Sequence, residues 1–288
     1  MPGTSSTRRI VFLACGVLIL LGGIGFWSSR EPTTLRVWFA DVGQGDGTII
    51  RTPSRETIIV DGGKQNDFLR EVDDHVPVTD RTIDLVVVTH ADADHVTGLT
   101  NLIASGRVQA VLMNRDATVK TKTYARLLAA IDDQHVPVLE AQAGQVFDYG
   151  DVRLRVLWPT ALGLKSAKTT NERSVVVKIS FGSQDMLLTG DAPDTVEQQV
   201  LKQGSDVAAE VLKVGHHGSG HSSTLAFLQA VQPTLGVISV GAKNNYGHPA
   251  KRVLNDLQRV GARVERTDHL GDILVLCTIT VCIPSVDH

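Results

Sequence analysis

Hydrophobic residues follow two spacings along most of the chain, one typical of strands and one typical of helices. Apolar residues that alternate or form short valine-rich runs predict strands at 35–40, 47–51, 56–60, 83–89, 152–158, 174–181, 184–189, 210–214, 235–240, 263–267 and 273–283. Apolar residues three and four positions apart predict helices at 96–104, 124–134, 195–202, 223–231 and 250–260. Because a hairpin followed by alternating elements occurs twice, the pattern predicts an α/β fold of two similar halves, an αββα four-layer sandwich.

The N-terminal part differs because it carries one long uncharged stretch. Residues 1–9 end in Arg8 and Arg9, and no charged residue follows until Arg30. As a helix, residues 10–27 would span about 27 Å, close to the hydrocarbon thickness of a bilayer. We therefore expect a cytoplasmic N-terminus at 1–9, a transmembrane anchor or cleaved signal peptide at 10–27, a linker at 28–34 and a folded domain at 35–288. Positive charge before the span predicts that this domain lies outside the cytoplasm, at the cell membrane as a single-pass protein or otherwise secreted or periplasmic.

Composition narrows the functional classes. The 288 residues are 42% hydrophobic with a net charge of −3, which excludes a globally basic nucleic-acid binder but not a local positive site. Three cysteines are too few for a disulfide-rich scaffold or a cysteine-based zinc module. Cys277 and Cys282 would face opposite sides of one continuous strand, so the spacing favours two buried thiols over a disulfide, which would need a bend.

The residues with the clearest chemistry follow the predicted strand at 83–89. His90, Asp92, Asp94 and His95 place four metal-binding side chains within residues 90–95. In an extended segment His90 and Asp92 point the same way, and the chain then turns into a helix near residue 96. Helix capping by an aspartate is the alternative, but capping needs only one such residue. The cluster therefore predicts a metal site at the carboxyl end of a buried strand.

This cluster and six further segments resemble the metallo-β-lactamase superfamily, and more closely the catalytic domain of the ComEC-type competence proteins. In chain order the segments are DVGQGD (41–46), IVDGG (59–63), HADADH (90–95), LTGD (188–191), KVGHHGS (213–219), NYGHP (245–249) and RTD (266–268). The resemblance extends from about residue 35 to 275 and implies the same αββα sandwich that the strand pattern predicts.

The resemblance also implies one or two divalent metal ions per chain, Mn²⁺ or Zn²⁺. The implied metal ligands are His90, Asp92, Asp94, His95, Asp191 and His216. The implied catalytic residues are Asp94, His217 and His248, the last near the leaving group. Because adjacent side chains of an extended segment diverge, we expect only one of His216 and His217 to bind metal; we favour His216, and His217 stays open as the alternative.

The chain departs from the general superfamily in two places. Asp92 stands where the superfamily has a histidine, and residues 171–174 occupy a stretch that carries a further histidine in the superfamily. Oxygen ligands favour a harder ion such as Mn²⁺ over Zn²⁺. We also expect Asp61 to be a structural turn residue behind the metals. The glycine-rich turn at 44–47 either lies beside the site or is an ordinary turn.

The resemblance implies a metal-dependent hydrolase, a DNA nuclease or other phosphodiesterase that uses metal-bound hydroxide. Its partners would be DNA or a phosphodiester substrate, and the membrane through the N-terminal segment; protein partners stay unknown from the sequence. Basic residues that could flank a cleft, or simply be solvated, are Arg115, Lys120, Lys122, Arg126, Lys165, Lys168 and Arg173. Hydrolysis of a small envelope phosphoester and a non-catalytic metal-holding binding module are the alternatives. We expect surface or structural roles for His75, His135, His269 and His288.

Overall fold

The structure, a computed structural model, describes residues 33–286, and residues from Thr34 onward form one compact unit. The predicted anchor or signal segment at 10–27 lies outside the described residues. Among residues 33–286, no helix combines the length and apolar character needed to cross a membrane.

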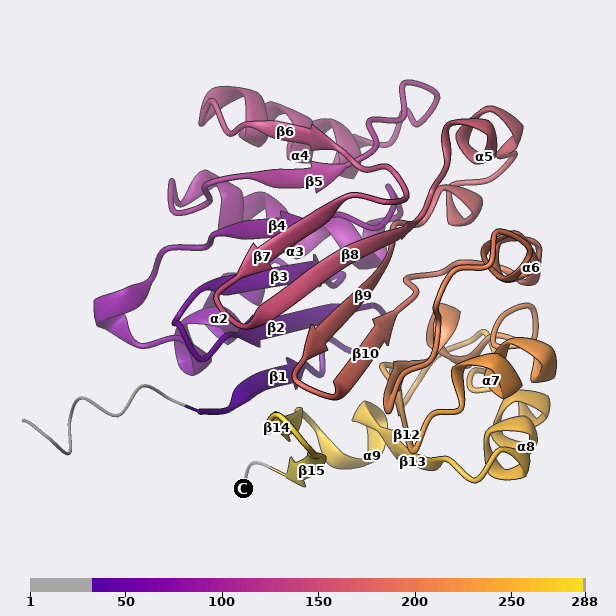
Figure 1. Ribbon diagram of the computed structural model, residues 1–288. Coiled ribbons are helices and arrows are strands. Elements are labelled where there is room, and N and C mark those ends of the chain that lie inside the picture. The colour runs from indigo at the N-terminus through magenta and orange to yellow at the C-terminus, as the bar shows by residue number, and fades with distance from the viewer. Residues whose placement is uncertain (1–32, 287–288) are drawn as a thin grey trace, which may run out of the picture. The chain divides into compact units, whose positions relative to one another are not determined.

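Two sheets form the centre of this unit (Figure 1). The first has eight strands in the spatial order β15 (Cys282–Val286), β14 (Ile273–Cys277), β1 (Leu35–Phe39), β2 (Gly47–Arg51), β3 (Thr57–Gly62), β4 (Leu85–Val87), β5 (Val111–Met113) and β6 (Val138–Glu140). The second has seven strands in the order β13 (Arg263–Arg266), β12 (Leu235–Ile238), β11 (Val211–Lys213), β10 (Gln184–Leu188), β9 (Val176–Phe181), β8 (Val152–Trp158) and β7 (Val146–Tyr149).

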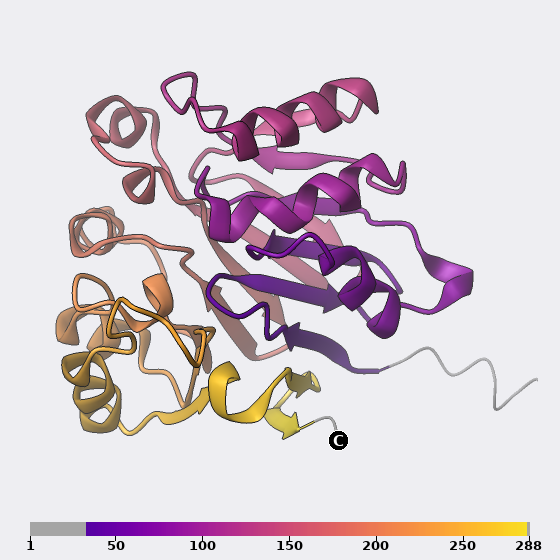
Figure 2. The ribbon, with the colours of Figure 1, turned by 180° about the vertical axis from the view of Figure 1, so that it is seen from behind.

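Helices cover the outer face of each sheet. The first sheet is covered by α2 (Phe68–His75), α3 (Ala93–Ala104) and α4 (Lys122–Asp133), which Figure 2 shows from their own side. The second is covered by α6 (Asp194–Lys202), α7 (Leu225–Val231) and α8 (Lys251–Arg259). Shorter elements are α5 (Ala161–Ser166), α9 (Thr267–Leu270) and the 3₁₀ turns η1 (Val78–Asp80), η2 (Asn171–Arg173) and η3 (Gly215–Gly218).

Alternating side chains explain the four layers. On β1, Val37 and Phe39 face the core between the sheets, whereas Trp38 packs beneath the helices of the first sheet. On β10, Leu188 faces the inter-sheet core and Leu187 faces the helices of the second sheet. Strands buried on both faces read as continuous apolar runs, as the sequence does here. The predicted two-sheet αββα fold is confirmed.

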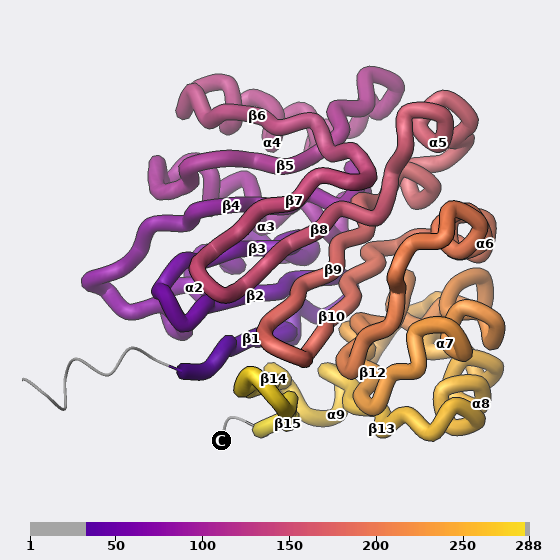
Figure 3. The backbone as a smooth tube through the Cα atoms, viewed as in Figure 1, coloured from indigo at the N-terminus to yellow at the C-terminus, as the bar shows by residue number. Residues whose placement is uncertain are grey.

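The C-terminal strand prediction is wrong. Residues 273–283 form a hairpin rather than one strand, because Thr278 N donates to Val281 O and reverses the chain. Cys277 and Cys282 then face each other across β14 and β15, with Cα atoms 4.0 Å apart, and form a disulfide. The expectation of two free thiols is therefore also wrong. Figure 3 traces this hairpin beside β1.

Candidate metal centre

The side chains predicted to bind metal lie on the loops that follow strands or, for Asp94 and His95, in the first turn of α3. His90 follows β4, Asp191 follows β10, and His216 follows β11. β3 is parallel to β4 in one sheet, and β10, β11 and β12 are parallel in the other. Because carboxyl ends of parallel strands meet at one edge, loops from both sheets converge there.

Thr89 fixes the orientation of His90. The Thr89 hydroxyl donates its hydrogen to Asp61 Oδ2 at 2.6 Å. Thr89 Oγ1 can therefore only accept a hydrogen bond from His90 Nδ1, at 2.9 Å. The Nε2 atom of His90 is on the opposite side of the ring from this hydrogen bond. It is buried and has no hydrogen-bond partner.

Asp61 also orients His95. Its Oδ2 lies 2.8 Å from His95 Nδ1, and its Oδ1 accepts from Thr89 N at 2.9 Å. Asp61 has a φ of 58°, a left-handed conformation that turns the carboxylate back under the loop after β4. Asp61 therefore accepts a hydrogen bond from a backbone amide, as predicted. It also orients an imidazole, which the sequence did not predict.

A buried charge network holds His217. Its Nδ1 donates to Ser239 O at 3.0 Å and lies 3.1 Å from Asp46 Oδ1. The same carboxylate oxygen pairs with Lys213 Nζ at 2.8 Å, and both side chains of that ion pair are at most 5% exposed. The predicted position of the 44–47 turn beside the site is confirmed, because Gly45 lies against Asp94 O, where a Cβ would be only 2.2 Å away.

The two adjacent histidines do not diverge. His216 has φ 50° and His217 has φ 55°, so the segment is a left-handed turn rather than the extended chain that we expected. His216 N donates to Gly190 O and Ser219 N donates to His216 O, which hold this turn. Such conformations cost about 1–3 kcal/mol each and are typical of functional sites. As a result both Nε2 atoms face Asp191 Oδ2, at 3.5 Å and 3.6 Å.

Asp191 lies at the centre of the cluster. Its Oδ1 is 3.3 Å from His95 Nε2, and its Oδ2 is 3.9 Å from His90 Nε2. Four buried atoms here have no hydrogen-bond partner: Nε2 of His90, His95 and His217, and Oδ1 of Asp191. Buried polar atoms are rarely left unpaired, and these four are all metal-ligating types. The residues therefore fit a divalent metal centre, with candidate groups His90–His95–Asp191 and Asp94–His95–His217.

The two remaining aspartates of the motif lie beside different histidines of the centre. Asp92 Oδ2 is 3.6 Å from His90 Nε2, and Asp94 Oδ2 is 3.4 Å from His217 Nε2. α3 begins at Ala93, earlier than expected, and Asp92 occupies its N-cap position without a side-chain capping bond. The capping alternative therefore does not explain the Asp92 carboxylate.

The buried carboxylates of the centre shift the pKa values of its histidines and favour bound positive charge. Burial lowers the pKa of His217, but Asp191 and Asp46 outweigh it and raise that pKa to about 9. Burial likewise lowers the pKa of His95, and Asp191 and Asp61 raise it well above its usual value. Burial raises the pKa of Asp191, yet His95 and His217 hold it well below its usual value.

The solvent side of the centre is different. His216 has a pKa lowered by burial, and its ring is 5.6 Å from the ring of His248. Asn171 Nδ2 lies 3.5 Å from the ring nitrogens of His216. Tyr246 is 68% exposed and stacks on His248 with ring centroids 5.7 Å apart. α8 starts at Lys251, so the cis His248–Pro249 bond belongs to the loop and not to the first helical turn.

Three contributors to the site had no role in the sequence interpretation: Lys213, Thr89 and Asn171. Lys213 had a visible signal, because it is the one charged residue of the apolar run 211–214, shortly before the histidine pair. Thr89 and Asn171 had none, because their roles depend on contacts with Asp61 and His216 that only the fold creates.

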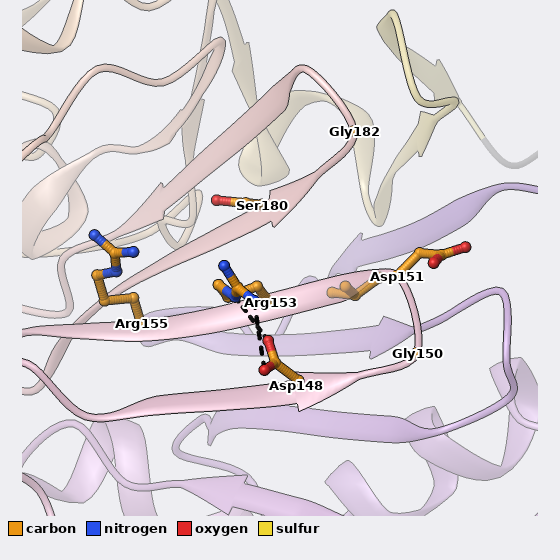
Figure 4. Close-up of a pocket in the computed structure, with 8 residues that line it drawn as sticks. Asp148, Gly150, Asp151, Arg153, Arg155, Ser180 and Gly182 are labelled. Atoms are coloured by element: carbon orange, nitrogen blue, oxygen red, sulfur yellow. Dashed lines mark hydrogen bonds and ion pairs between the residues drawn. The ribbon is translucent and has the colours of Figure 1, made fainter.

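A separate hollow of about 470 Å³ lies on the outer face of β7–β9 (Figure 4). Arg153 lines this hollow and pairs with Asp148 at 2.7 Å. The lining of the hollow shares no residue with the metal centre.

Of the basic residues predicted to flank a cleft, Arg115 pairs with Asp132 and Arg173 with Asp116, each at 2.9 Å. Lys120, Lys122, Arg126, Lys165 and Lys168 are exposed.

A two-sheet sandwich with a His- and Asp-rich centre at its strand ends is the architecture of a metallo-hydrolase fold. The metallo-beta-lactamase superfamily model matches residues 40–242, and the chain belongs to this superfamily. It is similar to the ComE operon protein 3 of Bacillus subtilis, with 32% identity over 278 residues, 91% of this chain and 35% of that protein. It is also similar to the competence protein ComA of Neisseria gonorrhoeae, with 28% identity over 88% of this chain and 34% of that protein.

These relatives are ComEC-type competence proteins, so the resemblance inferred from the motifs is confirmed. The chain spans about a third of the length of the curated relatives it matches. Among solved structures it resembles the metallo-beta-lactamase fold protein YhfI of Bacillus subtilis, with TM-score 0.56 and 12% identity over 85% of this chain and 99% of that one.

Proposed function

We propose that this chain is a metal-dependent phosphodiesterase that cleaves DNA. The observation that carries the proposal is the set of four buried ligand atoms, at Asp191 and the imidazoles around it, that have no hydrogen-bond partner. A divalent ion bound there lowers the pKa of water and neutralises charge on a phosphate, the two effects that phosphodiester hydrolysis needs.

The protein groups have separable tasks. His90, His95 and His217 each have Nδ1 held by a neighbour, so each would present Nε2 to a bound metal. This assigns to His217 the ligand role that the sequence favoured for His216. Asp94 Oδ2 lies 3.4 Å from His217 Nε2 and its side chain is 28% exposed, so it can orient an attacking water. His248 has a pKa lowered by burial and by His216 and His217, and it is positioned to contact the leaving group.

Tyr246 supports DNA over a small phosphoester as the substrate. An aromatic ring that is 68% exposed and stacked beside the centre offers a flat face to a nucleobase. The relatives named competence proteins support the same choice. Exposed lysines at 120, 122, 165 and 168 are available to phosphate groups.

The direct test is cleavage of labelled DNA by the full chain after removal of metal with a chelator. We expect activity to return with Mn²⁺ and to be absent with chelator alone. Asp148→Asn removes a carboxylate from the unrelated hollow on β7 and is the matched control for Asp191→Asn. Metal-loaded protein that cleaves neither DNA nor a small phosphodiester would favour a metal-holding binding module instead.

We further propose that the centre prefers Mn²⁺. Asp92 supplies a carboxylate beside His90, and Asn171 supplies an amide beside His216, where nitrogen ligands would favour zinc. Asp92→His should raise Zn²⁺ affinity and reduce manganese-supported activity, by about tenfold or more. Asp92→Ala is the control for loss of the carboxylate alone. The same metal preference in all three proteins would remove Asp92 from the ligand set.

We propose that residues 10–27 anchor the chain in the cell membrane, with the catalytic domain outside the cytoplasm. The Cys277–Cys282 disulfide supports this location, because disulfides persist in oxidising compartments. Protease added to intact spheroplasts should digest the domain. A domain that stays protected until the cells are lysed would contradict this topology.

A further inference from the structure

A second group of metal-binding side chains lies on the outer face of the first sheet. Glu71 and His75 are four residues apart on α2, so they share one face of the helix. Asp272, from the loop between α9 and β14, completes the group. One potential ligand atom of each residue lies within 4.8 Å of the others. The group shares no residue with the centre around Asp191.

His75 is held in a ligand-like orientation. Its ring stacks on Trp38, with centroids 4.9 Å apart and an interplanar angle of 21°. Its Nε2 atom is buried, has no hydrogen-bond partner and lies 3.5 Å from Asp272 Oδ2. Two ligands of a tetrahedral ion with bonds of about 2.1 Å are about 3.4 Å apart, close to this separation.

Asp272 is also pre-oriented. Its Oδ1 accepts a hydrogen bond from Asp41 N at 2.7 Å, which leaves Oδ2 for His75. Burial raises the pKa of Glu71, and the charge of Asp272 raises it further. The other charged neighbours that act on Glu71 are His75, Asp74 and Asp67, so acidic groups prevail around it. A cation would relieve this repulsion.

We propose that Glu71, His75 and Asp272 bind one divalent ion of the zinc class, separate from the catalytic centre. One imidazole and two carboxylates form a donor set that zinc accepts. The ion would connect the last turns of α2 to the loop before β14. Through the Asp41–Asp272 bond it would also hold the start of the 41–46 loop, which ends at Asp46 beside His217.

The first experiment counts bound zinc. Full-length protein is equilibrated with Zn²⁺, separated from free metal by gel filtration and analysed by mass spectrometry of the metal. His75→Phe keeps an aromatic ring against Trp38 but removes the nitrogen ligand, and we expect it to hold one zinc equivalent fewer than the wild type. His269→Phe is the matched control, because His269 is exposed and outside the group, and it should lose none.

A second readout follows the site itself. Cu²⁺ bound at Nε2 should quench the fluorescence of the stacked Trp38, and His75→Phe should lose that part of the quenching. Asp272→Asn keeps an oxygen that accepts from Asp41 N but removes the charge, so it should weaken zinc binding at this site by at least about tenfold. This variant tests the site if His75→Phe does not fold. Unchanged zinc content and affinity in Asp272→Asn, or equal zinc loss in His75→Phe and His269→Phe, would overturn the proposal. Loss of DNA cleavage is not a readout here, so this outcome is independent of the proposed nuclease.

Discussion

The metal centre has two walls that differ in burial and charge. The inner wall consists of Asp46, Asp61, His95, Asp191 and His217, whose side chains are at most 5% exposed. The outer wall consists of Asp92, His216, Tyr246 and His248. Its Asp92 and His216 side chains are 40% and 28% exposed.

The pKa values of the histidines in the two walls shift in opposite directions. Neighbouring carboxylates raise the pKa values of His95 and His217, whereas burial without sufficient compensation lowers those of His216 and His248. The inner wall is thus built to hold positive charge in place. The outer wall keeps neutral imidazoles and an open aromatic ring, which suits contact with a substrate.

The comparison predicts the largest loss at the centre of the inner wall. Asp191→Asn removes a negative charge that faces His90, His95 and His217. We expect DNA cleavage to fall by at least about 10³-fold, because the charge stabilisation supplied by metal amounts to several kcal/mol. Circular dichroism should show the fold unchanged. Near-normal turnover would mean that Asp191 does not hold the metal.

The buried ion pair of the inner wall should contribute more to the free energy of unfolding than an exposed ion pair of similar geometry. Lys213→Met leaves Asp46 buried without its lysine, and breaking such a pair costs about 3–5 kcal/mol. Arg153→Met breaks the exposed Arg153–Asp148 pair seen in Figure 4, for which we expect no measurable loss of stability. Urea unfolding measures both. Equal losses would show that the burial of Lys213 has no energetic consequence.

The stability of the metal-free protein should depend on pH through His217. Its folded pKa of about 9 lies above the ordinary value of 6.5, so its contribution is complete below about pH 6.5 and is lost as the pH rises through 9. The loss is on the order of 3 kcal/mol. Denaturant unfolding of chelated protein from pH 6 to 10 measures it. The slope should flatten in Asp46→Asn, which removes one of the carboxylates facing His217; the same slope in both proteins would assign the effect elsewhere.

The residues of the metal centre were not equally predictable from the sequence, for physical reasons. His90, Asp92, Asp94 and His95 were identifiable because four ligand types follow one buried strand, and local chain geometry places them together. His217 was harder to place, because its left-handed backbone belongs to a turn held by the His216 N–Gly190 O and Ser219 N–His216 O hydrogen bonds, which form only in the folded protein.

The same distinction applies to the fold. The alternation of side chains along each strand predicted the two sheets, because each side chain faces one of only two layers. The β14–β15 hairpin was missed because its turn, residues 278–281, contains neither glycine nor proline. The disulfide and the Asp272 group both depend on chain positions that this turn and the β1–β14 pairing create.

The smallest expected effect concerns the outer wall and separates DNA from small substrates. Tyr246→Ala removes the exposed ring beside His248, and stacking on a base contributes about 1–3 kcal/mol. We expect KM for single-stranded DNA to rise about tenfold while hydrolysis of a small alkyl phosphodiester is unchanged. Tyr246→Phe keeps the stacking face and should behave like the wild type. Equal losses on both substrates would place Tyr246 in the support of His248 instead, and no loss on DNA would remove the ring from the substrate path.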